Sequence, residues 1–162
     1  MSEPVAGSGA PHYLHFIERL LLTLWAGCLW AVGYLVAPLL FHQLADRQLA
    51  GELAGVMFRA VAAIGLGCGV LLLMLIVQRA GVAALRQWRS LLVIAMLALT
   101  LIGLFILQPQ IAALKAQSGW HDNVELAARF GRLHGLSSAL YSLTSLSALL
   151  LVLFGVQRAA QH

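Results

Sequence analysis

Charged residues are scarce in this chain of 162 residues. Lys, Arg, Asp and Glu together make up 10% of the sequence, hydrophobic residues make up 61%, and the mean hydropathy is +0.89. Soluble globular domains carry roughly 25% charged residues. The shortage of charge therefore excludes an ordinary soluble domain and predicts a membrane protein.

Cysteine is also rare, and the usual signatures of catalysis are missing. The two cysteines, Cys28 and Cys68, lie inside apolar runs and form neither a CxxC pair nor a disulfide framework. We interpret them as small buried apolar residues. The sequence has no catalytic motif of known mechanism, and its apolar runs contain no carboxylate pair or activated nucleophile. Hydrolytic and transferase chemistry are therefore disfavoured.

Long apolar runs occupy about half of the chain. They are Phe16–Leu40, Val61–Val77, Leu91–Leu107 and Leu136–Val156. A helix of about 20 apolar residues crosses the ~30 Å hydrocarbon core of a bilayer. The runs predict an all-α fold, an integral membrane bundle of four transmembrane helices. Between the first two, residues 43–56 alternate apolar and charged side chains in a pattern that predicts a short interfacial helix.

The predicted domain organisation is simple. We expect a disordered N-terminal tail over residues 1–14, a single transmembrane domain over residues 15–158 and a short C-terminal tail over residues 159–162. The N-terminal tail carries Glu3 but no Lys or Arg, which is unlike the basic start of a signal peptide. We therefore expect the first helix to remain in the mature protein.

The basic residues give an orientation. With four spans, both termini lie on the same side as the connection over residues 78–90, where Arg79, Arg86 and Arg89 crowd together without acidic residues. Basic residues favour the cytoplasmic side. We therefore predict a multi-pass protein of the bacterial inner membrane with both termini in the cytoplasm. The net charge of +4 is no sign of nucleic-acid binding, because these residues stand at helix ends, where they anchor to headgroups.

Small residues mark the expected helix contacts. Gly65 and Gly69 have the GxxxG spacing that lets membrane helices approach closely. The same surface suits either packing within the bundle or contact with a second copy or a partner membrane helix. Pro38 and Pro109 stand near the ends of the first and third spans, where each can end or kink a helix. Residues 71–80 and 150–159 also resemble one another, which hints at a repeat of two helix pairs.

A polar stripe on the last predicted helix is the leading candidate for a ligand-binding site. His134, Ser138, Tyr141 and Ser145 are spaced so that they share one helical face, and Ser137 lies beside them. In hydrocarbon such groups need partners, so we expect this face to turn into the bundle. It suits either binding of a small solute or hydroxyl hydrogen bonds that hold helices together.

Histidines raise a second possibility. His42, His121 and His134 belong to the same side of the membrane, where imidazoles are suited to a transition metal or to axial ligation of a haem. No pair has a tight ligand spacing, so an interfacial role is the alternative. At the opposite side, the first span begins with His15, and its adjacent Glu18 and Arg19 suit either an ion pair at the rim or a handle for a proton or ligand.

Several short motifs carry a family resemblance. They are Trp25-Ala26-Gly27, Ala37-Pro38-Leu39-Leu40-Phe41, Ala50-Gly51 followed by Met57-Phe58, and Phe130-Gly131-Arg132-Leu133-His134-Gly135-Leu136-Ser137. Together they resemble the transmembrane protein 205-like family, whose bacterial members carry a domain of unknown function. Tyr141 departs from the Asn expected in this family's last helix.

The resemblance implies a compact four-helix membrane protein and no particular reaction. It singles out Pro38, Phe41, His134, Gly135 and Ser137 as motif positions. A His ahead of a Trp- and Gly-containing first span is also similar, at the level of fold, to copper-resistance D and haem-associated membrane families. Two hypotheses therefore stay open. One is a non-enzymatic membrane component that binds or exports a small solute or binds a partner helix, and the other is a haem- or copper-binding redox protein.

Overall fold

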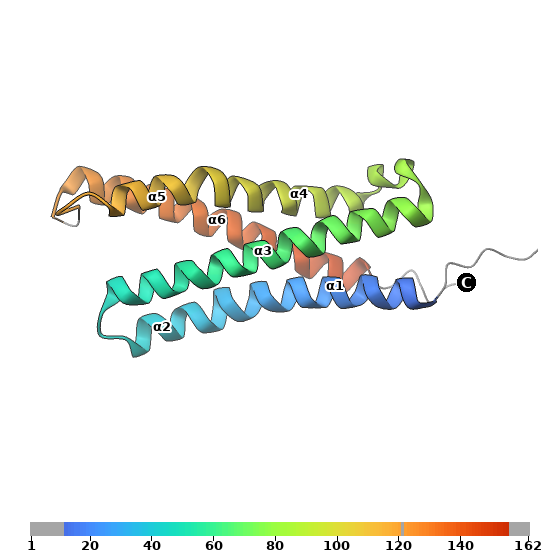
Figure 1. The fold of residues 1–162 in the computed structure, drawn as a ribbon, viewed down its shortest axis with the longest axis horizontal. Helices are drawn as coiled ribbons and strands as arrows, with labels where there is room; N and C mark the ends of the chain where they lie inside the picture. Colours follow the sequence, from blue (N-terminus) through green and yellow to red (C-terminus); the bar gives the residue numbers. More distant parts are fainter. Residues whose placement is uncertain (1–11, 121, 156–162) are drawn as a thin grey trace, which may run out of the picture.

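The computed structural model describes residues 12–120 and 122–155, all of them in helices or short connections. The elements in chain order are α1 (His12–Trp30), η1 (Ala31–Val36), α2 (Ala37–Gln43), α3 (Arg47–Ala80), η2 (Val82–Arg86), α4 (Trp88–Ile102), η3 (Gly103–Leu107), α5 (Gln108–Lys115) and α6 (Val124–Gly155). Figure 1 shows them as an elongated bundle. The α2–α3 and α5–α6 connections lie at one end, and η2, the start of α1 and the end of α6 lie at the other.

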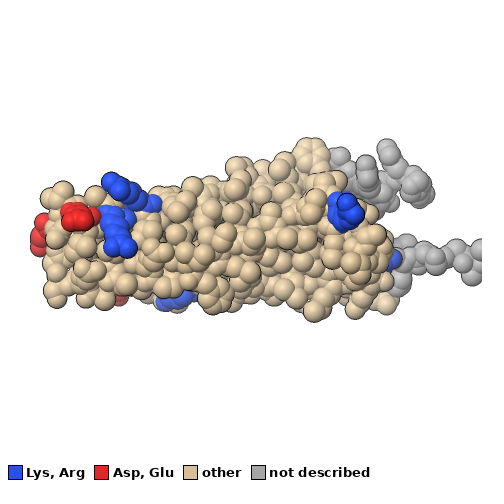
Figure 2. All heavy atoms as spheres, turned by 90° about the horizontal axis from the view of Figure 1, so that it is seen from above, with Lys and Arg blue, Asp and Glu red and all other residues tan. Residues whose placement is uncertain are grey.

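Four continuous helical rods are long and apolar enough to cross a membrane. They are Tyr13–Gln43, Arg47–Ala80, Trp88–Lys115 and Val124–Gly155. On the face seen in Figure 2, charged side chains gather toward the two ends and leave a long band without charged residues between them, which the apolar helices form. The predicted all-α bundle of four transmembrane helices is confirmed for the described residues, and the apolar band places the protein in a membrane.

Two predicted boundaries differ from the structure. Residues 47–56 form the first turns of α3 and are not a separate interfacial helix. The reason is local, because the Asp46 side chain accepts hydrogen bonds from the backbone N–H groups of Gln48 and Leu49 at 2.8 and 3.1 Å and starts the helix there. At the N-terminus, α1 begins at His12, so residues 12–14 of the predicted tail are helical. The rest of that tail and residues 159–162 lie outside the described residues.

Neither Pro38 nor Pro109 ends its span, and a π-helical segment precedes each of them. A proline inside a helix lacks a donor, and its ring crowds the carbonyl four residues earlier. Here η1 precedes Pro38 and η3 precedes Pro109, and both end with a hydrogen bond spanning five residues, from Ala37 N–H to the Val32 carbonyl and from Gln108 N–H to the Gly103 carbonyl. The wider turns accommodate the rings, so the helical rods continue.

Trp25 lies at the centre of the core. Its side chain is 1% exposed and packs in a cluster with residues from all four spans. Gly65 and Gly69 of α3 face it so closely that a Cβ added at Gly65 would collide with the indole, and one added at Gly69 would collide with Leu97 of α4. The absence of side chains at these two glycines is what lets α3 approach α1 and α4.

The two halves of the bundle have matching features. Residues 65, 68, 69 and 72 of α3 are buried, and so are the residues 79 positions later in α6 (65 to 144, 72 to 151). An offset of 71 aligns Pro38 with Pro109 and buried Trp25 with buried Met96. α1 packs on α3 as α4 packs on α6, and the contacts α3–α4 and α1–α6 close the ring. These features agree with the repeat of two helix pairs that the sequence suggests.

The close approach at Gly65 predicts a specific effect of adding one methyl group. We expect Gly65→Ala to lower the free energy of unfolding by about 1–3 kcal/mol, because Trp25 is too buried to yield to the new Cβ. Gly67→Ala is the matched control, since Gly67 stands on the same helix with open space at its Cβ position and alanine favours helix. Thermal unfolding in detergent measures both, and equal stability of the two variants would contradict this packing.

Candidate functional site

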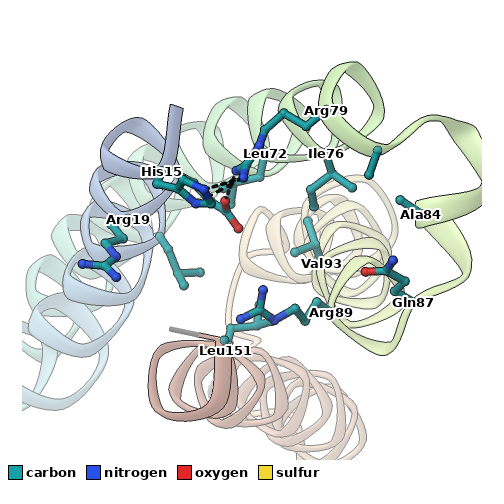
Figure 3. A pocket seen from close by; sticks show the side chains of 14 residues that line it. His15, Arg19, Leu72, Ile76, Arg79, Ala84, Gln87, Arg89, Val93 and Leu151 are labelled. Atoms are coloured by element: carbon teal, nitrogen blue, oxygen red, sulfur yellow. Dashed lines mark hydrogen bonds and ion pairs between the residues drawn. The ribbon is translucent and has the colours of Figure 1, made fainter. Parts of the chain in front are cut away.

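A cavity of about 320 Å³ opens at the end of the bundle where α1 begins and α6 ends. Figure 3 shows it between α1, α3, α4 and α6, with η2 along one side. Its polar lining residues are His15, Glu18, Arg19, Arg79, Gln87 and Arg89, and its larger apolar ones are Leu22, Leu72, Ile76, Val93 and Leu151. The volume is at the lower end of the range of small-molecule sites, roughly 300–1,000 Å³. We call this cavity the terminal pocket.

Arg79 connects α3 to α1 at the wall of the terminal pocket. Its Nη1 donates to Glu18 Oε2 at 2.9 Å, and its Nη2 donates to His15 Nε2 at 2.7 Å. The Arg79 and Glu18 side chains are 20% and 30% exposed, so the ion pair is partly shielded from water. An arginine N–H only donates, so the His15 ring nitrogen is the acceptor in this contact. His15 and Glu18 are one turn apart on α1, which lets one guanidinium bind both.

The pocket carries more positive than negative charge. Its lining includes three arginines, at positions 19, 79 and 89, and one carboxylate, that of Glu18. In Figure 3 the guanidinium of Arg89 points into the space below the His15–Arg79 contact, whereas Arg19 lies toward the outer side of α1. Within the described residues, Arg79 Nε is buried without a hydrogen-bond partner and Arg89 forms no ion pair. The Arg89 guanidinium, which lines the pocket without an ion-pair partner among the described residues, suits an anionic ligand.

The terminal pocket lies at the edge of the hydrocarbon layer. In α3 no charged residue stands between Arg59 and Arg79. That stretch of roughly 19 residues rises about 28 Å, close to the thickness of a hydrocarbon core. Arg79 and its partners therefore stand at the headgroup level, while Leu72 and other apolar lining residues reach toward the membrane interior.

The predicted polar stripe of α6 is only partly inside the bundle. His134 and Ser138 are exposed, Ser137 and Tyr141 are half-buried, and Ser145 is buried, so the expectation that the whole face turns inward is wrong for the first two. The Ser145 hydroxyl donates to the Tyr141 carbonyl within its own helix at 2.9 Å. The Tyr141 hydroxyl donates across to the Leu29 carbonyl of α1 at 2.6 Å. The inner part of the stripe is therefore occupied by helix-stabilising hydrogen bonds.

The two described histidines proposed as metal ligands, His42 and His134, lie in different surroundings. His134 stacks on Phe130 with ring centroids 5.6 Å apart, and Phe130 in turn contacts Trp120 at 4.6 Å. His42 is exposed on α2, and His121 lies outside the described residues. Across residues 12–120 and 122–155, no group of three or more His, Cys, Asp or Glu side chains is placed to hold a metal ion.

The remaining motif positions are structural or lie at the surface. Pro38 and Phe41 are exposed on α2. Gly135 is exposed on α6 and has open space at its Cβ position. By contrast, Gly65 and Gly69 are buried against Trp25.

The residues of the terminal pocket were the hardest to recognise as a site from the sequence. Glu18 was noted beside Arg19, but in the structure it pairs with Arg79, 61 residues away. Adjacent residues on a helix point in different directions, so Arg19 was the less suitable partner. The sequence did show that Glu18 and Arg19 stand at the edge of the first span on the same side of the membrane as Arg79 and Arg89.

Comparison with known proteins gives a family and no activity. Residues 20–119, more than half of the chain, match the model of a family described as Domain of unknown function (DUF4149). The matched segment includes Arg79 and Arg89 and begins just after Glu18. Searches of curated proteins and of solved structures found no significant match to this chain.

The hydrogen bond between α6 and α1 predicts a modest loss of stability when it is removed. We expect Tyr141→Phe to lower the free energy of unfolding by about 1 kcal/mol, because the carbonyl of buried Leu29 loses its cross-helix donor while the ring keeps its packing. Tyr34→Phe, at a tyrosine that is 50% exposed, is the control and should leave stability unchanged. Thermal unfolding in detergent compares them. A Tyr141→Phe protein as stable as the control would show that this bond contributes nothing.

Proposed function

The chain belongs to the family of the Domain of unknown function (DUF4149), for which no activity is given, so we propose its function from the site. We propose that it is a non-enzymatic integral membrane protein that binds a small anionic ligand in the terminal pocket. The observation that carries the proposal is the charge of the pocket. Arg79 and Arg89 face a space whose only lining carboxylate among the described residues, that of Glu18, is already bound to Arg79.

Binding suits the lining better than catalysis. Of the 14 described residues that line the pocket, none is Ser, Thr, Cys, Lys or Tyr, so no hydroxyl, thiol or amine nucleophile is present among them. The nearest candidate for a general base, His15, accepts a hydrogen bond from Arg79. Glu18 is held by the same arginine. Guanidinium groups, however, match phosphate and carboxylate oxygens in charge and in geometry.

We further propose that the protein is of the transmembrane protein 205-like type and lies in the bacterial inner membrane with both termini in the cytoplasm. The quoted motifs support the type. The concentration of Arg79, Arg86 and Arg89 around η2 supports the orientation. In this orientation the terminal pocket opens toward the cytoplasmic headgroups, where anionic molecules are abundant.

A phosphate titration tests the proposed binding. We expect the melting temperature of the detergent-purified protein to rise saturably with inorganic phosphate, at constant ionic strength against chloride, because a ligand that binds only the folded state stabilises it. In Arg89→Gln the rise should be lost. Arg132→Gln removes the same charge from an exposed position on α6, far along the helix from the pocket, and should behave like the natural protein. The same rise in all three proteins, or no rise in any, would contradict the proposal.

A further inference from the structure

The two halves of the bundle carry opposite charges at equivalent places. The offset of 71 that aligns Trp25 with Met96 and Pro38 with Pro109 also aligns Glu18 with Arg89 (18 to 89). In the first half, Glu18 neutralises Arg79. In the second half a guanidinium stands where the first half has a carboxylate, and both residues line the same pocket. Among the described residues, the pocket therefore has a cation without an ion-pair partner at the position that corresponds to Glu18.

Arg89 is positioned to bind something in the pocket. It is partly buried, and its guanidinium lies close to Gly155 at the end of α6, where a Cβ would stand 3.7 Å from Nη2. Its only ring contact in the described part of the chain is with the neighbouring Trp88, 6.0 Å from the guanidinium carbon to the ring centroid. Figure 3 shows the Arg89 guanidinium inside the cavity, facing the group formed by His15 and Arg79. An anion between the two guanidiniums would supply the missing negative charge.

The apolar lining residues indicate a second property of the ligand. The same cavity is bordered by the apolar side chains of Leu22, Leu72, Ile76, Val93 and Leu151. Three of them, Leu72, Val93 and Leu151, belong to the hydrophobic core. A free inorganic anion has no favourable contact with this apolar surface. A molecule with a charged head and a hydrocarbon tail contacts both parts, and the pocket lies at the depth where such heads and tails meet.

We propose that the ligand of the terminal pocket is an anionic phospholipid, with its phosphate between Arg79 and Arg89 and the start of an acyl chain against the apolar lining. This inference rests on the proposed function and names its ligand class. The phosphate accepts hydrogen bonds from the Arg89 guanidinium and lies beside the Arg79 side chain, and the Glu18–Arg79 pair stays in place. A zwitterionic lipid brings its own cation to a pocket that already has excess positive charge, so anionic lipids are preferred.

Native mass spectrometry of the detergent-purified protein tests the lipid assignment. The probes are phosphatidylglycerol, phosphatidylcholine and glycerol phosphate, which carries the head without the tail. We expect the natural protein to retain phosphatidylglycerol about tenfold more tightly than either of the other probes. Arg89→Gln should lose about tenfold in phosphatidylglycerol affinity, and Arg132→Gln should lose none.

The outcomes separate the two proposals. Stabilisation by inorganic phosphate together with equal binding of glycerol phosphate and phosphatidylglycerol would overturn the lipid assignment and leave the anion-binding function standing. Equal loss of phosphatidylglycerol in Arg89→Gln and Arg132→Gln would also overturn it, because general attraction to basic residues would then explain the binding. If neither phosphate nor phosphatidylglycerol depends on Arg89, both proposals fail.

Discussion

The contact of Trp25 with Gly65 and Gly69 determines how the first two spans meet. The two glycines leave room for an indole that is almost completely buried, so α1 and α3 lie close together. Glu18 stands two turns before Trp25 on α1, and Arg79 stands beyond Gly69 on α3, so the same close approach brings the ion pair together at the end of the bundle. The terminal pocket therefore depends on packing deep in the membrane, at some distance from its own charges.

Backbone hydrogen bonding explains the shape of the first and third spans, which contain Pro38 and Pro109. In hydrocarbon each N–H and C=O needs a partner within the protein, which leaves little tolerance for a break at a proline. The first and third spans meet this constraint in the same way, with a π-helical segment just before Pro38 or Pro109. The second and fourth spans, α3 and α6, contain no proline and run as α-helix throughout. This shared pattern agrees with the repeat of two helix pairs that the similarity of residues 71–80 and 150–159 suggests.

The sequence was sufficient for the parts of the fold that depend on hydropathy. The four spans and their all-α arrangement follow from long runs without charge, and the structure agrees. It was insufficient where local and distant contacts compete. The amphipathic pattern of residues 47–56 suits an interfacial helix, but the cap at Asp46 makes them the start of α3. The stripe through His134 has a perfect helical spacing, yet spacing alone does not say how far along α6 the neighbouring helices extend, and His134 and Ser138 are exposed.

The site was hard to predict for a related reason, since its key pair joins residues 61 positions apart and its charge imbalance appears only when four helix ends are placed together.

The central claim is that a phosphate lies between Arg79 and Arg89. Solid-state NMR of the ¹⁵N-arginine protein in phosphatidylglycerol bilayers measures it through dipolar dephasing of guanidinium nitrogens by lipid ³¹P. The account predicts dephased signals that disappear in Arg89→Gln and persist in Arg132→Gln. Identical dephasing in the natural protein and in Arg89→Gln would contradict it.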